Sequence, residues 1–98
     1  MGTLVDVSDQ RIRRRIVVHG RVQGVFFRDS VRQRARSREV HGRIRNRPDG
    51  TVEAVLEGPP DAVDALVRFC GTGPQGARVS RVEVADEAPE GLDGFEVG

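Results

Sequence analysis

The first half of the chain changes from one hydrophobic pattern to another at Gly20. Residues 12–19 are rich in β-branched apolar residues and stop at this glycine, which is typical of a β-strand. Beyond a short loop, Phe27, Val31 and Ala35 recur at every fourth position, which is helical spacing. The positions between them are mostly arginine, so this helix has a narrow apolar stripe and a hydrated opposite face. The pattern therefore predicts a strand followed by a helix.

The second half of the pattern predicts a hairpin, a second helix and further strands. Residues 40–47 and 51–57 are predicted strands, and the Arg-Pro-Asp-Gly run between them has the composition of a tight turn. The Gly-Pro-Pro-Asp run at 58–61 ends the second of these strands and opens a helix, since proline is tolerated in a first helical turn. The apolar face of this helix consists of Ala62, Val63, Leu66, Val67, Phe69 and Cys70. Residues 78–84 are a predicted fourth strand, and residues 95–97 a short edge strand.

The predicted elements follow the order β-α-β-β-α-β, which is the ferredoxin-like arrangement. Each helix follows one strand and precedes another, so right-handed crossovers place both helices on one face of the sheet. We therefore predict an α+β sandwich with a four- to five-stranded, mostly antiparallel sheet. In this prediction residues 11–98 form a single domain, and residues 1–10 form a flexible, mostly polar N-terminal arm.

Length and composition limit the chain to one small domain. Its 98 residues leave room for one core, built mostly from Val, Leu, Ile and Ala because Trp and Tyr are absent. A single cysteine excludes an internal disulfide. The sequence has no signal-peptide pattern, no myristoylation motif and no apolar run of about 20 residues. We therefore expect a cytoplasmic protein without a membrane partner.

The charged residues are distributed unevenly, although the net charge is only +1. Residues 1–49 contain thirteen arginines and five acidic residues, whereas residues 50–98 contain three arginines and ten acidic residues. All sixteen basic residues are arginine, whose planar guanidinium suits phosphate and carboxylate recognition. A hydrated surface combined with genomic composition also explains such a distribution. Charge alone therefore does not identify a partner.

The sequence GRVQGVFFR, residues 20–28, connects the first predicted strand to the first helix. Backbone N–H groups at a helix N-terminus lack intrahelical partners, so this position favours anions. Gly20 and Gly24 permit backbone angles at which successive N–H groups point inward, and Arg28 can add a forked contact to the same anion. The nucleotide-binding motifs GxxxxGKS/T and GxGxxG are absent. Spacing alone supports equally a phosphate site and a tight turn followed by a solvated arginine.

Two stretches resemble the signatures of the acylphosphatase family. Residues 20–28 match every specified position of the first signature, glycine-x-valine-glutamine-glycine-valine-x-aromatic-arginine. Residues 42–58 are similar to the second signature and carry four of its residues at the family spacing. These four residues are Asn46, Gly50, Val52 and Gly58. The resemblance extends over residues 12–97, which is nearly the whole chain.

The resemblance implies a ferredoxin-like fold and the hydrolysis of acyl phosphates to a carboxylate and inorganic phosphate. The catalytic arginine of the family corresponds to Arg28, and its water-positioning asparagine corresponds to Asn46. The family's phosphate cradle corresponds to the backbone of Arg21, Val22, Gln23, Gly24 and Val25. The substrate is thus expected to be a small-molecule acyl phosphate, with inorganic phosphate as product and inhibitor. We expect residues 11–98 to form an acylphosphatase-like domain that acts as a monomer.

The chemistry of acyl phosphates agrees with these residues and calls for no cofactor. The leaving group is a carboxylate whose conjugate acid has a pKa near ~4, so it departs as an anion without a general acid. Phosphoryl transfer depends mainly on positioning and electrostatic stabilisation. His19, His41 and Cys70 do not have the spacing of metal ligands, so we expect no metal and assign these three residues no function.

Four residues depart from the pattern of the family that the chain resembles, and one of them, Ile44, is only bulkier than the usual Val or Ala. Arg38 replaces a common core leucine, and Glu39 replaces a common helix-ending glycine, so the first helix is expected to lack its usual stop. Arg43 replaces a common aromatic residue. If Arg43 lies at the entrance of the site, it alters the preference of the enzyme for the acyl group. These changes are expected to affect stability, by about 0.5–3 kcal/mol each, more than catalysis.

Three alternatives stand beside an active acylphosphatase. Ferredoxin-like sheets also bind RNA by stacking bases on strand aromatics, but residues 11–18 and 51–57 contain none, so we expect no specific nucleic-acid partner. Larger carbamoyl-transferring maturation proteins contain a similar domain, but this sequence lacks their zinc-binding cysteines and further domains. An inactive phosphate-binding paralogue is disfavoured because Arg28 and Asn46 are both present.

Overall fold

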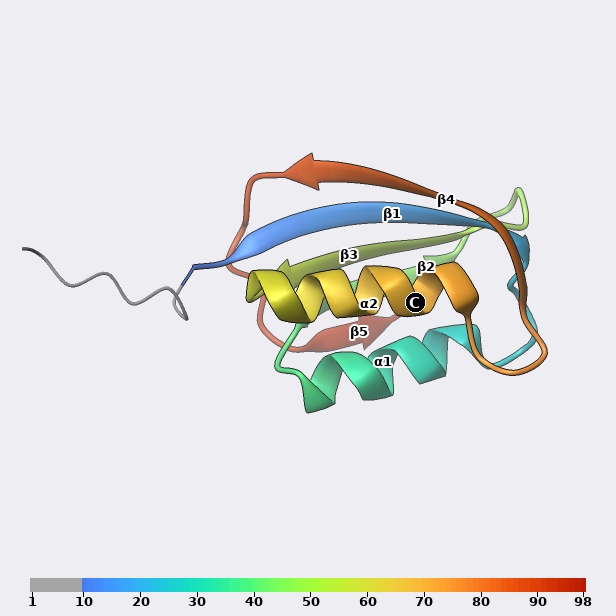
Figure 1. Ribbon diagram of the computed structural model, residues 1–98, viewed down its shortest axis with the longest axis horizontal. Helices are drawn as coiled ribbons and strands as arrows, with labels where there is room; N and C mark the ends of the chain where they lie inside the picture. The colour runs from blue at the N-terminus through green and yellow to red at the C-terminus, as the bar shows by residue number, and fades with distance from the viewer. Residues whose placement is uncertain (1–9) are drawn as a thin grey trace, which may run out of the picture.

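Within residues 10–98, five strands and two helices follow one another in the predicted order (Figure 1). The computed structural model describes residues 10–98, so the predicted arm of residues 1–10 lies almost wholly outside the described residues. The elements are β1 Ile12–Arg21, α1 Phe27–Ser37, β2 His41–Asn46, β3 Val52–Gly58, α2 Pro60–Thr72, β4 Arg78–Glu87 and β5 Phe95–Val97. Strand β4 continues to Glu87, beyond its predicted end at residue 84.

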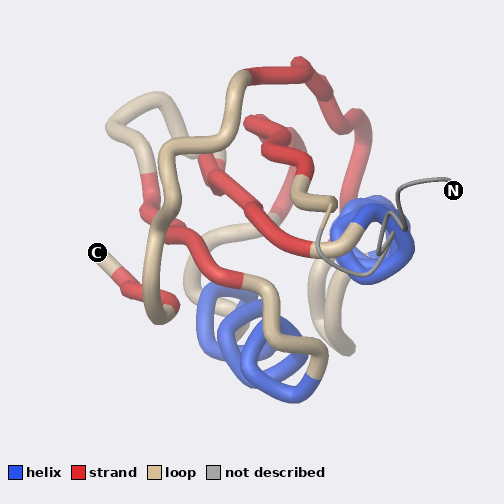
Figure 2. The backbone as a smooth tube through the Cα atoms, turned by 90° about the vertical axis from the view of Figure 1, so that its left-hand side faces the viewer, coloured by secondary structure: helices blue, strands red, loops and turns tan. Residues whose placement is uncertain are grey.

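The strands form one sheet in the order β4-β1-β3-β2-β5. Neighbouring strands pair antiparallel except at one edge, where the short β5 pairs parallel with β2. Both helices cover the same face of this sheet, as Figures 1 and 2 show. The predicted α+β, ferredoxin-like sandwich with two helices on one face is therefore confirmed.

The hydrophobic core lies between the sheet and the two helices. Its helical residues are Phe27, Val31, Ala35, Val63, Leu66 and Cys70. Ile16 and Val18 of β1 are buried on the same side, because alternate side chains of a strand point to the same face. Each such apolar side chain contributes about 1.5–3 kcal/mol when it is removed from water. Cys70 is one of these packing residues, and burial raises the pKa of its thiol to about 12.

The turn that follows α1 contains a residue with a left-handed backbone that is not glycine. The N–H group of Val40 donates to the carbonyl oxygen of Ala35 at 2.8 Å, a turn that requires a positive φ at the residue before Val40. That residue is Glu39, with φ +57°. Val40, beyond the helix, is buried in the core, whereas Arg38 is exposed. The usual glycine is absent, as predicted, and Glu39 instead takes the strained backbone position that glycine would occupy.

A buried ion pair holds the β4–β5 connection against the sheet, on the face opposite to the helices. The Nη1 group of Arg13 lies 2.8 Å from Oε2 of Glu57, and both side chains are almost fully buried. Glu57 also accepts hydrogen bonds from the backbone N–H groups of Glu90, Gly91 and Leu92 at 2.9, 3.0 and 3.1 Å. Burial opposes the charged form of Glu57 most strongly, but these donors together with Arg13 lower its pKa to about 2. These bonds therefore anchor the β4–β5 connection, which leads to β5 beside β2.

Candidate active site

A cavity of about 270 Å³ lies where the loop after β1, the start of α1 and the ends of β2 and β5 meet. It is lined by Val22, Gly24, Phe26, Phe27, Arg28, Asp29, Asn46 and Val97. Arg28 and Asn46 are the two predicted catalytic residues, and they come from different elements. The fold therefore brings the two signature stretches to one cavity.

The two glycines of the loop are needed for different reasons. Gly20 has a φ of +123° and lies at a bulge, where the register of β1 against β4 shifts between His19 and Gly20. A Cβ atom at Gly20 would lie 2.1 Å from the carbonyl oxygen of Arg78, so a side chain does not fit there. Gly24 has a φ of +75° but open space around it. The first position thus requires glycine because of a close approach, and the second favours it because of the backbone angle.

Unpaired backbone donors line up along the loop before α1. Within residues 10–98, the N–H groups of residues 22–26 donate no hydrogen bond to another residue. Helix α1 begins immediately afterwards at Phe27, so these groups lie at the end of the helix that carries a partial positive charge. The loop therefore carries, next to the cavity, several backbone donors without a partner among the described residues, an arrangement that favours an anion.

The end of β5 holds the guanidinium of Arg28, which projects from the first turn of α1. Its Nη1 group donates to the carbonyl oxygen of Gly98. The N–H group of Gly98 in turn donates to the carbonyl oxygen of Ile44 in β2, at 2.8 Å. The neighbouring Asp29 also lines the cavity, but its carboxylate accepts from Arg32 at 2.6 Å, which offsets its charge. No other hydrogen bond joins the guanidinium of Arg28 to a described residue, so most of its donors remain available.

Asn46 lines the same cavity and carries an unused acceptor. It is the last residue of β2 and lies opposite Val52 of β3. Its side-chain oxygen is buried and has no hydrogen-bond partner among the described residues. Leaving such a buried group unpaired costs about 1–3 kcal/mol. A small donor such as water that reaches this oxygen removes that cost.

The side chain of Gln23 ties the loop to the turn between β2 and β3. Its Nε2 group donates to the carbonyl oxygens of Arg47 and Thr51, both at 2.9 Å. The hydroxyl and N–H groups of Thr51 donate to Oδ1 of Asp49 at 2.6 and 3.0 Å, which lowers the pKa of the Asp49 carboxyl. The loop is thereby fixed to the hairpin that carries Asn46, a contact that the sequence analysis did not predict.

Comparison with known proteins identifies the family of this chain. The profile of the acylphosphatase family matches residues 14–97. The chain belongs to the acylphosphatase family. An acylphosphatase of Rubrobacter xylanophilus is 60% identical over 94 residues, which cover 95% of this chain and 86% of the relative. That of Thermococcus kodakarensis is 56% identical over 88 residues, which cover 90% of this chain and 97% of the relative. The solved structure of an acylphosphatase from Coxiella burnetii matches with a TM-score of 0.86 and 35% identity, covering 90% and 93% of the two chains.

Family membership confirms the predicted enzymatic activity. The chain hydrolyses acyl phosphates, small-molecule substrates, to a carboxylate and inorganic phosphate. An inactive phosphate-binding paralogue is therefore set aside. The ferredoxin-like arrangement of the strands and helices agrees with the solved acylphosphatase structures.

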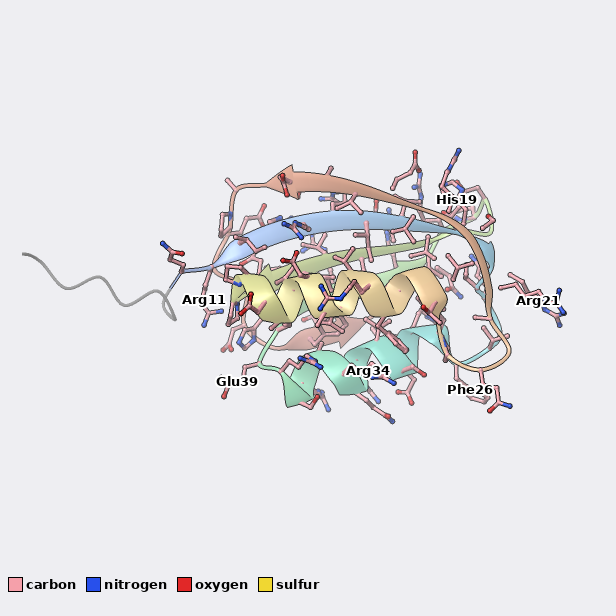
Figure 3. All side chains as sticks on the ribbon, viewed as in Figure 1. Arg11, His19, Arg21, Phe26, Arg34 and Glu39 are labelled. Carbon is pink, nitrogen blue, oxygen red and sulfur yellow. The ribbon has the colours of Figure 1, made fainter. Side chains whose placement is uncertain are left out.

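Only two residues of the predicted cradle of this acylphosphatase line the cavity. Among Arg21, Val22, Gln23, Gly24 and Val25, the residues that line the cavity are Val22 and Gly24. The side chain of Arg21 projects away from the end of β1 into solvent (Figure 3). Val25 is half-buried and packs against the core. Because the predicted contacts are made by backbone N–H groups, the cradle itself stays a prediction.

Four residues of the cavity were not predicted: Phe26, Phe27, Asp29 and Val97. Phe26 occupies an unspecified position inside the first signature, so the signature gave no reason to select it. Val97 belongs to a predicted edge strand, and its place in the cavity depends on the parallel pairing of β5 with β2. Neither the pairing partner nor the direction of a strand of three residues follows from its pattern.

Arg43 lies on the exposed face of the sheet, opposite Val55 of β3 and Glu96 of β5. It is not among the residues that line the cavity. This corrects the expectation that Arg43 could influence the entrance of the site, which followed from its position in the second signature. Residues alternate between the two faces of a strand, and Arg43 points to the opposite side from Ile44, which is buried in the core.

The two histidines lie outside the cavity and have partners of their own. Nε2 of His19 lies 2.7 Å from a carboxylate oxygen of Glu83, and Nδ1 of His41 accepts from the N–H group of Gly94 at 2.7 Å. Residues 10–98 contain no group of three or more His, Cys, Asp or Glu side chains placed to hold a metal ion. The same residues form no helix long and apolar enough to cross a membrane.

Proposed function

We propose that the loop after β1 and Arg28 hold the phosphate group of an acyl phosphate while Asn46 positions the attacking water. The observation that carries this proposal is the position of Arg28 and Asn46 in one cavity, beside a loop with unpaired N–H donors. Together these groups supply donors for the phosphate and, in Asn46, an acceptor for water. A phosphate bound between them is a target for in-line attack.

The phosphate oxygens are bound by two kinds of donor in this proposal. The oxygens accept hydrogen bonds from the predicted cradle, the backbone of residues 21–25, at the positive end of α1; the N–H groups of residues 22–25 have no partner among the described residues. Arg28 adds charge-assisted hydrogen bonds through the guanidinium donors that Gly98 does not use. Both kinds of donor are in place before the substrate binds, so they stabilise the charge that shifts onto the oxygens in the transition state.

The attacking water is oriented by Asn46, whose side-chain oxygen has no other partner among the described residues. The water oxygen forms a bond to phosphorus as the bond from phosphorus to the bridging acyl oxygen breaks. The electron pair of the broken bond leaves with the carboxylate, and a phosphate oxygen takes the proton of the water. An acyl phosphate dianion and water thus give a carboxylate and dihydrogen phosphate, with no protein base and no covalent intermediate.

This mechanism makes two assignments that the chemistry of the substrate supports. A carboxylate is stable as an anion, so no protein acid needs to protonate the leaving group. Charge neutralisation is assigned to Arg28 and the loop N–H groups, so we propose that no metal ion takes part. The phosphate end is bound alike in every acyl phosphate, so the acyl group is recognised separately.

Hydrolysis of benzoyl phosphate in ¹⁸O-labelled water with excess EDTA tests the proposal directly. We expect rapid turnover in EDTA, with one ¹⁸O atom in the released phosphate and none in benzoate. Label in benzoate would place the attack at the carbonyl carbon and contradict the assigned role of the cradle. Loss of activity in EDTA that returns with added Mg²⁺ would contradict the metal-free assignment.

We also propose that the chain acts as a monomer without a specific nucleic-acid partner. The exposed face of the sheet is occupied by ion pairs such as Arg15 with Glu87, at 2.8 Å, and Arg45 with Glu53, at 3.0 Å. Such a face offers neither the apolar area of an obligate dimer nor aromatic residues for base stacking. Sedimentation equilibrium at two protein concentrations, with and without single-stranded RNA, tests both statements, and a shift in mass in either experiment would contradict one of them.

A further inference from the structure

Exposed apolar surface gathers at the mouth of the active-site cavity. Among residues 10–98, the exposed large hydrophobic residues are Phe26, Val84 and Val97. Phe26 and Val97 both line the cavity, whereas Val84 lies on β4 outside it. Their exposed fractions are 85% for Phe26, 49% for Val84 and 39% for Val97. Single exposed apolar residues are common, but two in the same small cavity form a surface suited to an apolar ligand group.

The backbone of Phe26 gives a second reason to look for a role of its side chain. Phe26 has a left-handed conformation, with φ +57° and ψ +26°, directly before α1. Glycine or asparagine adopts this conformation with less strain than a bulky residue. The side chain makes no capping hydrogen bond to the helix and is not part of the core. Neither capping nor packing therefore explains a phenylalanine at this position, which Figure 3 shows projecting from the end of the molecule near α1.

Both apolar side chains are close in the chain to the group that binds phosphate in the proposed function. Phe26 lies two positions before Arg28 in the chain. Val97 directly precedes Gly98, whose carbonyl oxygen accepts a hydrogen bond from Arg28. In an acyl phosphate the acyl carbon is separated from phosphorus by a single bridging oxygen. A substrate held by its phosphate in this cavity must therefore place its acyl group near the cavity's apolar lining.

We propose that Phe26, together with Val97, is the surface that binds the acyl group of the substrate. The enzyme then favours acyl phosphates whose acyl group is aromatic or branched and apolar over those with a small acyl group. The ring of Phe26 stacks against such a group, which covers apolar area on both partners. This inference rests on the proposed function, because the phosphate must occupy the cradle for the acyl group to reach Phe26.

The test compares benzoyl phosphate with acetyl phosphate, two substrates with the same phosphate and different acyl groups. KM, kcat and the inhibition constant of inorganic phosphate are measured for the unchanged protein and for Phe26→Ala, Phe26→Leu and Val84→Ala. We expect Phe26→Ala to raise KM for benzoyl phosphate about tenfold more than KM for acetyl phosphate. Phe26→Leu should restore most of the difference, because leucine keeps an apolar surface. The different intrinsic reactivities of the two substrates cancel in this comparison.

Val84→Ala is the matched control, since it removes an exposed apolar side chain outside the cavity and should leave both substrates unaffected. An equal change for the two substrates in Phe26→Ala, or no change, would overturn the inference. A parallel rise in the inhibition constant of inorganic phosphate would also overturn it, because phosphate has no acyl group and the effect would then come from the loop backbone. Absence of turnover of both substrates by the unchanged protein, or label in benzoate in the ¹⁸O experiment, would instead contradict the proposed function.

Discussion

The side-chain nitrogen of Gln23 lies 2.9 Å from the carbonyl oxygen of Thr51 and donates a hydrogen bond to it. The same nitrogen donates to the carbonyl oxygen of Arg47, so one amide group spans both ends of the turn between β2 and β3. Gln23 belongs to the loop with unpaired N–H donors, and the turn follows Asn46 directly. The bond therefore fixes the distance between the proposed phosphate cradle and the proposed water site.

Replacing Gln23 with alanine should weaken both stability and catalysis. Two hydrogen bonds are lost, so we expect the free energy of unfolding to fall by about 1–2 kcal/mol. Turnover of benzoyl phosphate should fall several-fold, because the loop and Asn46 are no longer held at a fixed separation. Urea unfolding and steady-state kinetics measure the two effects. Gln75→Ala, at an exposed residue before β4, is the control and should change neither. Unchanged turnover in Gln23→Ala would show that the bond does not position the site.

Replacing Arg28 with alanine should abolish phosphate binding and turnover together. The guanidinium supplies charge-assisted donors in the cradle, and the loss of such donors lowers kcat/KM by about 10²–10³-fold or more. Arg28→Lys keeps the charge but not the planar fork, so only part of the activity should remain. Arg68→Ala removes an exposed arginine of α2 and serves as the control for charge. Inhibition by inorganic phosphate that persists in Arg28→Ala would be incompatible with the assigned cradle.

Replacing Asn46 with alanine should separate water positioning from phosphate binding. We expect kcat to fall by about a hundredfold, because the attacking water loses its orientation. The inhibition constant of inorganic phosphate should stay nearly the same, since the cradle donors are intact. Steady-state kinetics with phosphate as competitive inhibitor measure both quantities. If the affinity for phosphate falls as strongly as kcat, Asn46 holds the substrate and the account of the water is incorrect.

Local pattern was sufficient to predict the elements that frame the site. The recurrence of Phe27, Val31 and Ala35 at helical spacing predicted the buried stripe of α1, and all three are buried. The Arg-Pro-Asp-Gly run predicted the turn between β2 and β3, which closes with a hydrogen bond from Gly50 to Arg47 at 3.1 Å. Both signals depend on residues close together in the chain, which is why they can be interpreted without the fold.

Contacts between residues far apart in the chain could not be predicted in the same way. The pairing of β5 with β2 brings Val97 to the cavity and Gly98 to Arg28, but a strand of three residues does not specify its neighbour. The buried pair of Arg13 and Glu57 was also missed, because a charged residue in a strand is usually exposed. Its burial depends on the β4–β5 connection, which covers it and has no pattern of its own.

Glu57 should make the fold sensitive to acid. Its pKa is lowered in the folded protein from an ordinary 4.5 to about 2, so the folded state binds the proton more weakly than the unfolded state. This stabilisation is complete above the pKa of the unfolded state and is lost as the pH falls from 4.5 towards 2. The shift corresponds to roughly 3 kcal/mol. Urea unfolding between pH 7 and pH 2.5 measures the loss.

A comparison with Glu57→Gln isolates this group from the other carboxylates. The variant should be less stable than the unchanged protein at pH 7, and the difference should shrink as the pH falls below 4.5. Glu96→Gln, at an exposed residue of β5, is the control and should show a small difference at every pH. A difference between Glu57→Gln and the unchanged protein that stays constant down to pH 2.5 would mean that the ionised form of Glu57 does not provide the stabilisation.

Replacing Glu39 with glycine should stabilise the protein. Glu39 has a φ of +57° at the end of α1, where the hydrogen bond from Val40 to Ala35 fixes the turn. Glycine adopts this angle without the clash of a Cβ atom, so we expect a gain of about 0.5–1 kcal/mol in the free energy of unfolding. Glu39→Ala separates this effect from the loss of charge, because alanine keeps the Cβ atom and should gain little. If alanine stabilises as much as glycine in thermal and urea unfolding, the gain comes from removing the carboxylate beside the helix C-terminus, where the helix dipole is negative, and not from the backbone angle.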